Sequence, residues 1–171
     1  MYDYVLQFGL DDESTKKVQV IRNHIRLCGF IDKQRGWPPH ITIEKYNCNN
    51  RNEFVERVEK VVSKLSKFDI DLNSFGKFSN GTLFITPTPA DNLVKSKEMF
   101  DEELGSMKVP SKYDNYNPHV TLCTNDHFEQ SKVAAFQKFK PFTATVTKVW
   151  IYTENMVLVK EFELLDNTNN H

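Results

Sequence analysis

The chain has 171 residues, which fits one ordinary domain spanning 1–171 with room for a sizeable core. Hydrophobic residues make up 39% of the sequence and aromatic residues 12%, which is typical of a globular protein and excludes a disordered chain. Lys and Arg number 22 against 23 Asp and Glu, so the net charge is only −1. Without an overall positive field, duplex DNA is excluded as a partner, and any nucleic-acid ligand should be small or an RNA end.

The three cysteines, Cys28, Cys48 and Cys123, are widely spaced and include no CxxC pair, which argues against a disulfide framework and a structural zinc site. The first residues contain no basic segment ahead of an apolar one, and no window approaches the roughly 18 apolar residues of a membrane span. We therefore expect a cytoplasmic protein with no membrane partner. Nothing in the sequence requires an assembly, so a monomer is expected.

Alternating polarity, helical spacing of apolar residues, and Gly and Pro punctuation predict the elements of the first half. In chain order these are a strand over 2–10, a helix from Asp11 or Asp12 to about Leu27, a loop over 29–39, a strand over 40–46 and a helix near 52–66.

The second half begins at a hairpin signal, Asn80-Gly81, the dipeptide that best tolerates the two positive φ angles of a type I′ turn. The predicted elements around and after it are two strands between 68 and 89, a helix over 91–104, a loop over 105–118, a strand over 119–124, a helix over 126–139, strands over 142–152 and 156–164, and a frayed tail over 166–171.

A repeat connects the two halves. The segment PHITI at 39–43 recurs as PHVTL at 118–122, and a strand precedes each copy at a similar offset, with Val5 lying 35 residues before His40 and Leu83 lying 36 before His119. Each half then has the same element order, so pseudo-repeat halves of about 1–80 and 81–165 are expected.

Each copy places a histidine and a threonine on one face of a strand. Side chains alternate along a strand, so His40 and Thr42 share a face, as do His119 and Thr121. If an approximate twofold axis relates the halves, the two pairs face each other across one cleft. One neutral imidazole can then act as base and the other, protonated, as acid, while the hydroxyls bind phosphate oxygens. This scheme needs no metal or other cofactor, and either histidine can serve as the base.

Two other interpretations compete with this one. A lone histidine at the start of a strand is usually structural, and only the duplication argues otherwise. A metal site could draw on His40, Glu44, His119 and Cys123, but His40 and Glu44 lie about 13 Å apart along a regular strand, too far to bind one ion.

The motifs His40-Ile41-Thr42 and His119-Val120-Thr121, 79 residues apart, resemble those of the 2H phosphoesterase superfamily, and the chain is most similar to its 2′-5′ RNA ligase-like and cyclic phosphodiesterase branch. The resemblance implies an α+β, bilobal, pseudo-twofold fold in which two antiparallel sheets line a central cleft, with helices packed outside. It implies catalytic roles for the two histidines and phosphate binding by the two threonines.

The resemblance further implies metal-independent action on 2′,3′-cyclic phosphate ends or 2′-5′ linkages of RNA or small nucleotides. RNA ligation at the same site, or a non-catalytic module that binds nucleotides or RNA ends, remains an alternative. Further candidates for phosphate contact or base stacking are Arg35, Trp37, Lys45, Tyr46, Tyr113, Tyr116 and Tyr152.

Overall fold

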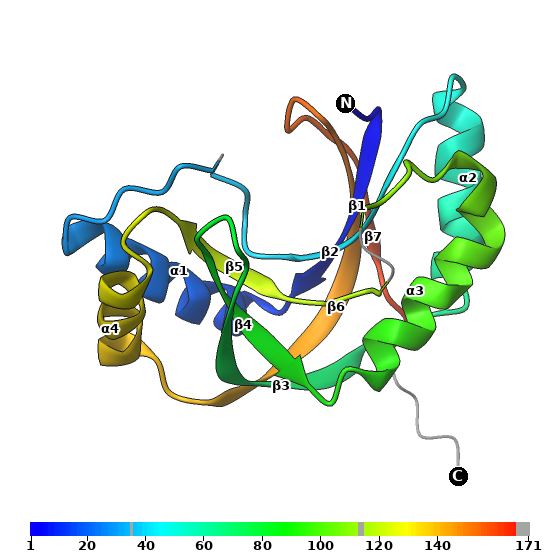
Figure 1. Ribbon diagram of the computed structural model, residues 1–171. Helices are drawn as coiled ribbons and strands as arrows, with labels where there is room; N and C mark the ends of the chain where they lie inside the picture. The colour runs from blue at the N-terminus through cyan, green and yellow to red at the C-terminus, as the bar shows by residue number, and fades with distance from the viewer. Residues whose placement is uncertain (35, 113–114, 167–171) are drawn as a thin grey trace, which may run out of the picture.

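The computed structural model describes residues 1–34, 36–112 and 115–166 of the chain (Figure 1). Its helices are α1 (Asp12–Leu27), α2 (Arg51–Val62), α3 (Asp91–Leu104) and α4 (Phe128–Lys138), with a short 3₁₀ helix η1 (Gly105–Met107). Its strands are β1 (Tyr4–Leu10), β2 (Ile41–Tyr46), β3 (Phe68–Lys77), β4 (Thr82–Thr88), β5 (Val120–Thr124), β6 (Phe142–Thr153) and β7 (Leu158–Glu163). The predicted α+β class and the order of elements are confirmed.

Helix α1 shows why the local sequence folds as predicted. The carboxylate of Asp11 accepts a hydrogen bond from the amide of Ser14, which satisfies a backbone donor that the first turn leaves unpaired. Val18, Ile21 and Ile25 recur at helical spacing and are all buried. They give the helix one apolar face, which packs into the core.

The strands form one antiparallel sheet in the order β1-β2-β5-β4-β3-β6-β7, and an additional pairing of β1 with β6 closes the first six into a ring. Two separate sheets were expected, so this detail of the prediction is corrected. The long strand β6 joins what would be two sheets, because it pairs with β1, β3 and β7. On the opposite side, β2 and β5 meet only at Ile41 and Val120.

The strand registers repeat between the halves. In each half the first strand pairs with the motif strand, and one extra residue bulges out of the motif strand just after the threonine. The pairs on either side of the bulge are Leu6–Glu44 and Gln7–Thr42 in the first half, and Leu83–Cys123 and Phe84–Thr121 in the second. The duplication inferred from the pentapeptides therefore extends to the backbone.

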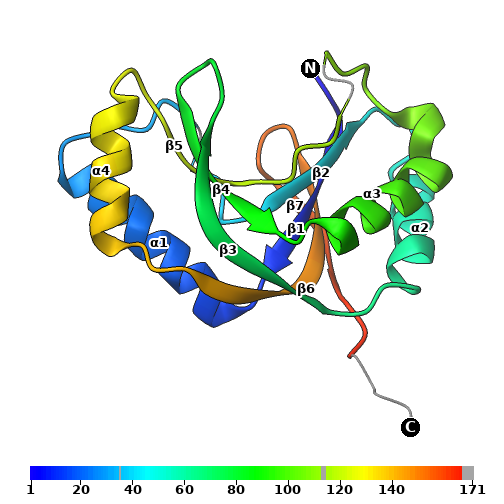
Figure 2. The same cartoon turned by 60° about the horizontal axis from the view of Figure 1, so that its bottom comes forward.

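The two sequence halves interlock. Helix α1 packs beside α4, and α2 packs beside α3, so each helix pair takes one member from each half (Figure 2). The view shows these pairs on opposite sides of the strands. A division near residue 80 describes the sequence repeat, but each side of the molecule needs both halves.

The turn between β3 and β4 differs from the predicted type I′ hairpin. Only Gly81 has a positive φ there, at 88°, and its amide donates to the carbonyl of Phe78 at 3.1 Å. This is a type I turn followed by a left-handed residue, which also fits a twisted hairpin. A β-carbon at Gly81 would lie 2.3 Å from the carbonyl oxygen of Asn125, so glycine is required.

Among the described residues, no helix combines the length and apolar character that crossing a membrane would require.

Candidate active site

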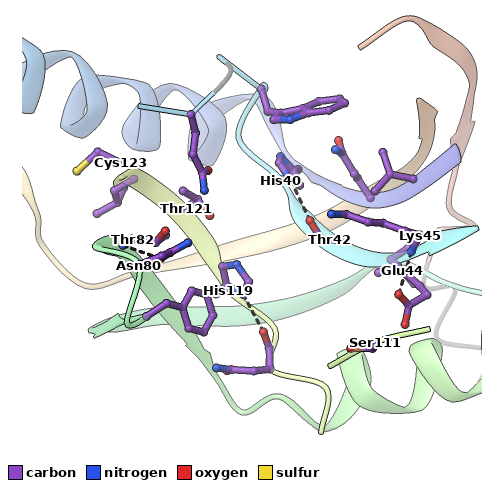
Figure 3. A pocket seen from close by; sticks show the side chains of 18 of the residues that line it. His40, Thr42, Glu44, Lys45, Asn80, Thr82, Ser111, His119, Thr121 and Cys123 are labelled. Atoms are coloured by element: carbon purple, nitrogen blue, oxygen red, sulfur yellow. Dashed lines mark hydrogen bonds between the residues drawn. The ribbon is translucent and has the colours of Figure 1, made fainter. Parts of the chain in front are cut away.

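The two HxT motifs line one cleft of about 1490 Å³ (Figure 3). His40 and Thr42 from β2 and His119 and Thr121 from β5 all line it, and the close-up shows the two pairs on facing sides of the same space. The alternate residues of the motifs, such as Ile41, are buried in the core. The predicted split of each motif between cleft and core is confirmed.

Both imidazoles are held in the same way. Nδ1 of His40 lies 2.7 Å from the carbonyl oxygen of Pro38, and Nδ1 of His119 lies 2.8 Å from that of Asn117. A carbonyl can only accept, so Nδ1 carries the hydrogen in both rings and the neutral form keeps a lone pair on Nε2. In the first motif, Thr42 Oγ1 donates to His40 Nε2 at 3.1 Å. In the neutral rings, the nitrogens that keep a lone pair are therefore the Nε2 atoms.

Burial keeps both histidines neutral in the free protein. Burial, with smaller contributions from Arg22 and His119, lowers the pKa of His40 from 6.5 to about 4, although the hydrogen bond to the Pro38 carbonyl opposes the shift. Burial also lowers the pKa of His119, which the Asn117 carbonyl opposes. A histidine in this cleft would therefore have to gain a proton, for example when an anionic ligand enters, before it could donate one.

Arg22 of α1 connects the two motifs. Its Nε and Nη2 donate to the carbonyl of Thr121 at 3.0 and 2.7 Å, and its Nη1 donates to the carbonyl of Trp37 at 2.6 Å. Trp37 lies three residues before His40, so one guanidinium holds the second motif and the loop that leads into the first. Burial lowers its pKa to about 10, which leaves it charged at neutral pH.

A reciprocal set of hydrogen bonds joins the first motif to the segment that precedes the second motif. The hydroxyl of Tyr116 donates to the carbonyl of Thr42 at 2.8 Å. The amide of Val109 donates to the carbonyl of Lys45 at 3.0 Å, while the amide of Lys33 donates to that of Thr124 at 2.8 Å. Each loop is thus anchored on the other motif's strand, which fixes the two histidines relative to each other.

Aromatic rings surround the histidines unequally. The ring centroid of His119 lies 4.8 Å from that of Phe78 and 5.1 Å from that of Phe84. His40 lies 6.1 Å from the ring of Trp37, which in turn lies 5.3 Å from Tyr152. One histidine has phenylalanines around it, and the other has larger rings with polar atoms.

Positive charge gathers at the cleft even though the chain as a whole is nearly neutral. Among the described residues, the basic ones that line it are Arg22, Arg26, Lys33, Lys45, Lys97, Lys108 and Lys112. The acidic ones in the same described set are Asp32, Glu44 and Asp101. This excess of positive charge favours an anionic ligand.

Of the other described residues that the sequence suggested for phosphate contact or base stacking, three line the cleft, Trp37, Lys45 and Tyr116. Lys45 is exposed at the cleft, with its ammonium 4.8 Å from the ring centroid of Tyr2. Tyr152 is half-buried beside Trp37. Arg35 and Tyr113 lie outside the described residues.

The structure does not bring Tyr46 to the cleft. Strict alternation along the strand predicted that Tyr46 shares a face with His40. The bulge after Thr42 adds one residue to β2, so the residues beyond it point to the opposite faces from those that alternation predicts. Tyr46 is fully buried, with its ring 5.5 Å from that of Phe54 in α2.

The groups considered for a metal site have other partners. Glu44 pairs with the ammonium groups of Lys97 and Lys108, both at 3.3 Å. Cys123 is buried, and the side-chain Nδ2 of Asn125 donates to its Sγ at 3.6 Å. Within the part of the chain that the structure describes, no group of three or more His, Cys, Asp or Glu side chains is placed to hold an ion.

Sequence reasoning missed Arg22 and also Gln7, a buried glutamine of β1 that lines the cleft. Arg22 reads as one more polar residue on an amphipathic helix, and its partner Thr121 lies 99 residues away. A signal for Gln7 was present, since a polar side chain in the middle of an apolar strand requires an explanation.

The geometry agrees with comparisons to known proteins. A family model of the 2′-5′ RNA ligase superfamily matches residues 10–156. The fold is similar to that of Escherichia coli LigT complexed with 3′-AMP, with a TM-score of 0.67 at 13% identity over 95% of this chain and 98% of that one.

Two further solved structures share the fold. TT0787 of Thermus thermophilus has a TM-score of 0.64 at 13% identity, covering 96% of this chain and 99% of that one. Usb1 of Kluyveromyces marxianus has a TM-score of 0.57 at 12% identity, covering 95% and 96%. No curated protein sequence matches the chain.

Two HxT motifs on facing strands of an internally duplicated fold define a 2H phosphoesterase. The family match spans most of the chain, and the protein belongs to the 2′-5′ RNA ligase superfamily.

Proposed function

We propose that this protein is a metal-independent phosphodiesterase that opens 2′,3′-cyclic phosphates or cleaves 2′-5′ linkages at RNA ends or in small nucleotides. The observation that carries the proposal is the matched geometry of His40 and His119. Each presents Nε2 to the cleft with its Nδ1–H bound to a backbone carbonyl.

The chemistry balances with these side chains alone. One neutral Nε2 removes a proton from water as the water oxygen attacks phosphorus, and the other histidine, protonated at Nε2, donates its proton to the ribose oxygen as its bond to phosphorus breaks. Thr42 and Thr121 donate hydrogen bonds to the non-bridging oxygens, whose charge increases in the transition state. The product from a cyclic phosphate is a nucleoside monophosphate.

The environment of the site supports a nucleotide substrate. Of the residues that the structure describes, seven basic and three acidic ones line the cleft, which suits a phosphate-bearing ligand. LigT, which shares the fold, has been solved with 3′-AMP, with ATP and with NADP⁺. In ligation, a ribose hydroxyl takes the place of water as the nucleophile on the cyclic phosphate, and the ring P–O bond breaks as the new linkage forms. Three free cysteines suit a reducing compartment, and we place the protein in the cytoplasm as a monomer.

The test is hydrolysis of a substrate panel in the presence of a chelator. The panel contains 2′,3′-cyclic mononucleotides, short RNAs with cyclic phosphate ends and 2′-5′-linked dinucleotides. We expect turnover by the parent protein and its loss in His40→Ala and His119→Ala. Equal turnover by parent and variants, or turnover abolished by the chelator alone, would overturn the proposal. Binding without turnover on every substrate would favour a non-catalytic module.

A further inference from the structure

The face of β1 that is turned away from the core carries an unexpected polar side chain. Tyr4, Leu6, Phe8 and Leu10 belong to the hydrophobic core, whereas Gln7 lines the cleft. Gln7 is only 1% exposed, and among the described residues its Oε1 has no hydrogen-bond partner. An unpaired buried polar group destabilises the folded protein, so its presence here calls for a role in the ligand-bound state.

The other half of the protein shows that the fold does not need an amide at this position. Gln7 pairs with Thr42 across β1 and β2, and Phe84 pairs with Thr121 across β4 and β5, at the same step of the repeated register. Phe84 is buried, with its ring 5.1 Å from that of His119. An apolar ring therefore occupies the equivalent place, and the glutamine distinguishes the His40 side of the cleft.

Aromatic side chains accompany the amide on that side. Trp37 lines the cleft, with its ring 6.1 Å from His40 and 5.3 Å from Tyr152. Tyr152 of β6 pairs with Val5 of β1. Two residues along the same pair of strands, Gln7 pairs with Trp150. Both Trp37 and Tyr152 are half-buried. Rings that keep part of their surface open beside a polar group are suited to stacking a nucleobase.

We propose that Gln7, Trp37 and Tyr152 form a nucleobase subsite on the His40 side of the cleft. The two rings stack against the base, and the amide of Gln7 pairs with its polar edge. The terminal torsion of a glutamine is soft, so the amide can turn toward the cleft when a base arrives. Its unpaired atom is an acceptor, which favours bases with an exocyclic amino group, such as adenine and cytosine, over uracil, whose exocyclic groups are both carbonyls. The proposal rests on the proposed function, because it takes the substrate to be a nucleotide.

Binding measurements test the subsite without relying on turnover. Isothermal calorimetry compares adenosine, cytidine and uridine 3′-monophosphates with inorganic phosphate, which has no base. In Gln7→Met, which keeps the length of the side chain and removes the amide, we expect adenosine and cytidine 3′-monophosphates to bind about three- to tenfold more weakly, with phosphate unchanged. In Trp37→Ala, all three nucleotides should bind about tenfold more weakly, with phosphate again unchanged.

The thermal midpoint of Gln7→Met gives a second readout. If Gln7 only stabilised the fold, its replacement would lower the midpoint. Since Gln7→Met removes an unpaired polar group, its thermal midpoint should equal or exceed that of the parent. Gln130→Met, on the exposed surface of α4, serves as the matched control with unchanged binding. A lower midpoint for Gln7→Met, or equal losses for nucleotides and phosphate, or no loss at all, would overturn the subsite. Base-dependent binding in a protein that hydrolyses nothing would retain the subsite and reject the proposed activity. Hydrolysis with base-independent binding would do the reverse.

Discussion

The guanidinium of Arg22 donates two hydrogen bonds to the backbone carbonyl of Thr121, at 3.0 and 2.7 Å, and so joins the first helix to the second HxT motif. A third bond from Arg22 holds the Trp37 carbonyl ahead of His40. The distance between the two motifs therefore depends on Arg22, whose three hydrogen bonds all go to backbone carbonyls and not to the imidazoles.

Shortening the Arg22 side chain should reduce catalysis more than binding. Arg22→Lys keeps the charge but cannot make three directed bonds, so we expect kcat to fall about 10- to 100-fold, because hydrogen bonds from charged groups contribute about 1.5–3 kcal/mol. Steady-state kinetics on a 2′,3′-cyclic nucleotide checks this. Arg57→Lys is the matched control, since Arg57 also donates to a backbone carbonyl, that of Glu103, but lies outside the cleft. Equal kcat in the two variants would contradict a positioning role for Arg22.

The lowered pKa of His40 should make folding stability depend on pH. The unfolded chain protonates His40 near 6.5, whereas the folded protein does so only near 4. Below pH 6.5 the unfolded state therefore binds more protons, and stability falls until about pH 4, by up to ~3 kcal/mol. Denaturant unfolding at pH values from 7 to 4 should show a smaller loss in His40→Gln. Parallel curves for parent and variant would show that His40 titrates normally.

The hydroxyl groups of Thr42 and Thr121 should contribute to kcat/KM through hydrogen bonds to the phosphate, and their methyl groups should not. Thr42→Val and Thr121→Val remove the hydroxyl with little change of shape, and we expect each to lower kcat/KM about tenfold or more, because a donor to the developing charge is removed. Thr42→Ser and Thr121→Ser keep a donor and should stay within about threefold of the parent. Serine variants as impaired as valine variants would assign the threonines a packing role.

The positive cleft should make oligonucleotide binding sensitive to salt. Arg26 and Lys112 are exposed and line the cleft, so they can contact phosphates beyond the reacting one. For a short RNA with a cyclic phosphate end, we expect log KM to rise with log salt, and the slope to fall by about 0.7 for each phosphate that Arg26→Gln or Lys112→Gln no longer neutralises. Lys16→Gln, exposed on α1 outside the cleft lining, is the control. Slopes that match the parent in all three variants would confine binding to a single phosphate.

The parts of the fold that depend on local sequence were predictable. The end of α1 at Leu27 and the limits of α3 follow from the helical periodicity of apolar residues, and the division of each HxT motif between core and cleft follows from strand alternation. The duplication made the candidate site predictable as well, because two equivalent strands bring equivalent residues together.

The features that escaped prediction depend on long-range pairing. The bulge that removes Tyr46 from the cleft exists only because β2 pairs with β1, and the single sheet depends on β6 reaching three strands. Two of the three bonds of Arg22 join residues 99 positions apart. No local pattern carries such information, since each depends on where distant segments meet.

Single-turnover hydrolysis of a 2′,3′-cyclic nucleotide by His40→Gln, His119→Gln and the double variant tests most directly whether the two histidines act as one unit. If they do, each single variant should lose about 10²- to 10⁴-fold in rate, and the double variant should be hardly slower than the slower single one. Single variants that retain more than about a tenth of the parent rate, or losses that multiply in the double variant, would contradict a paired acid and base.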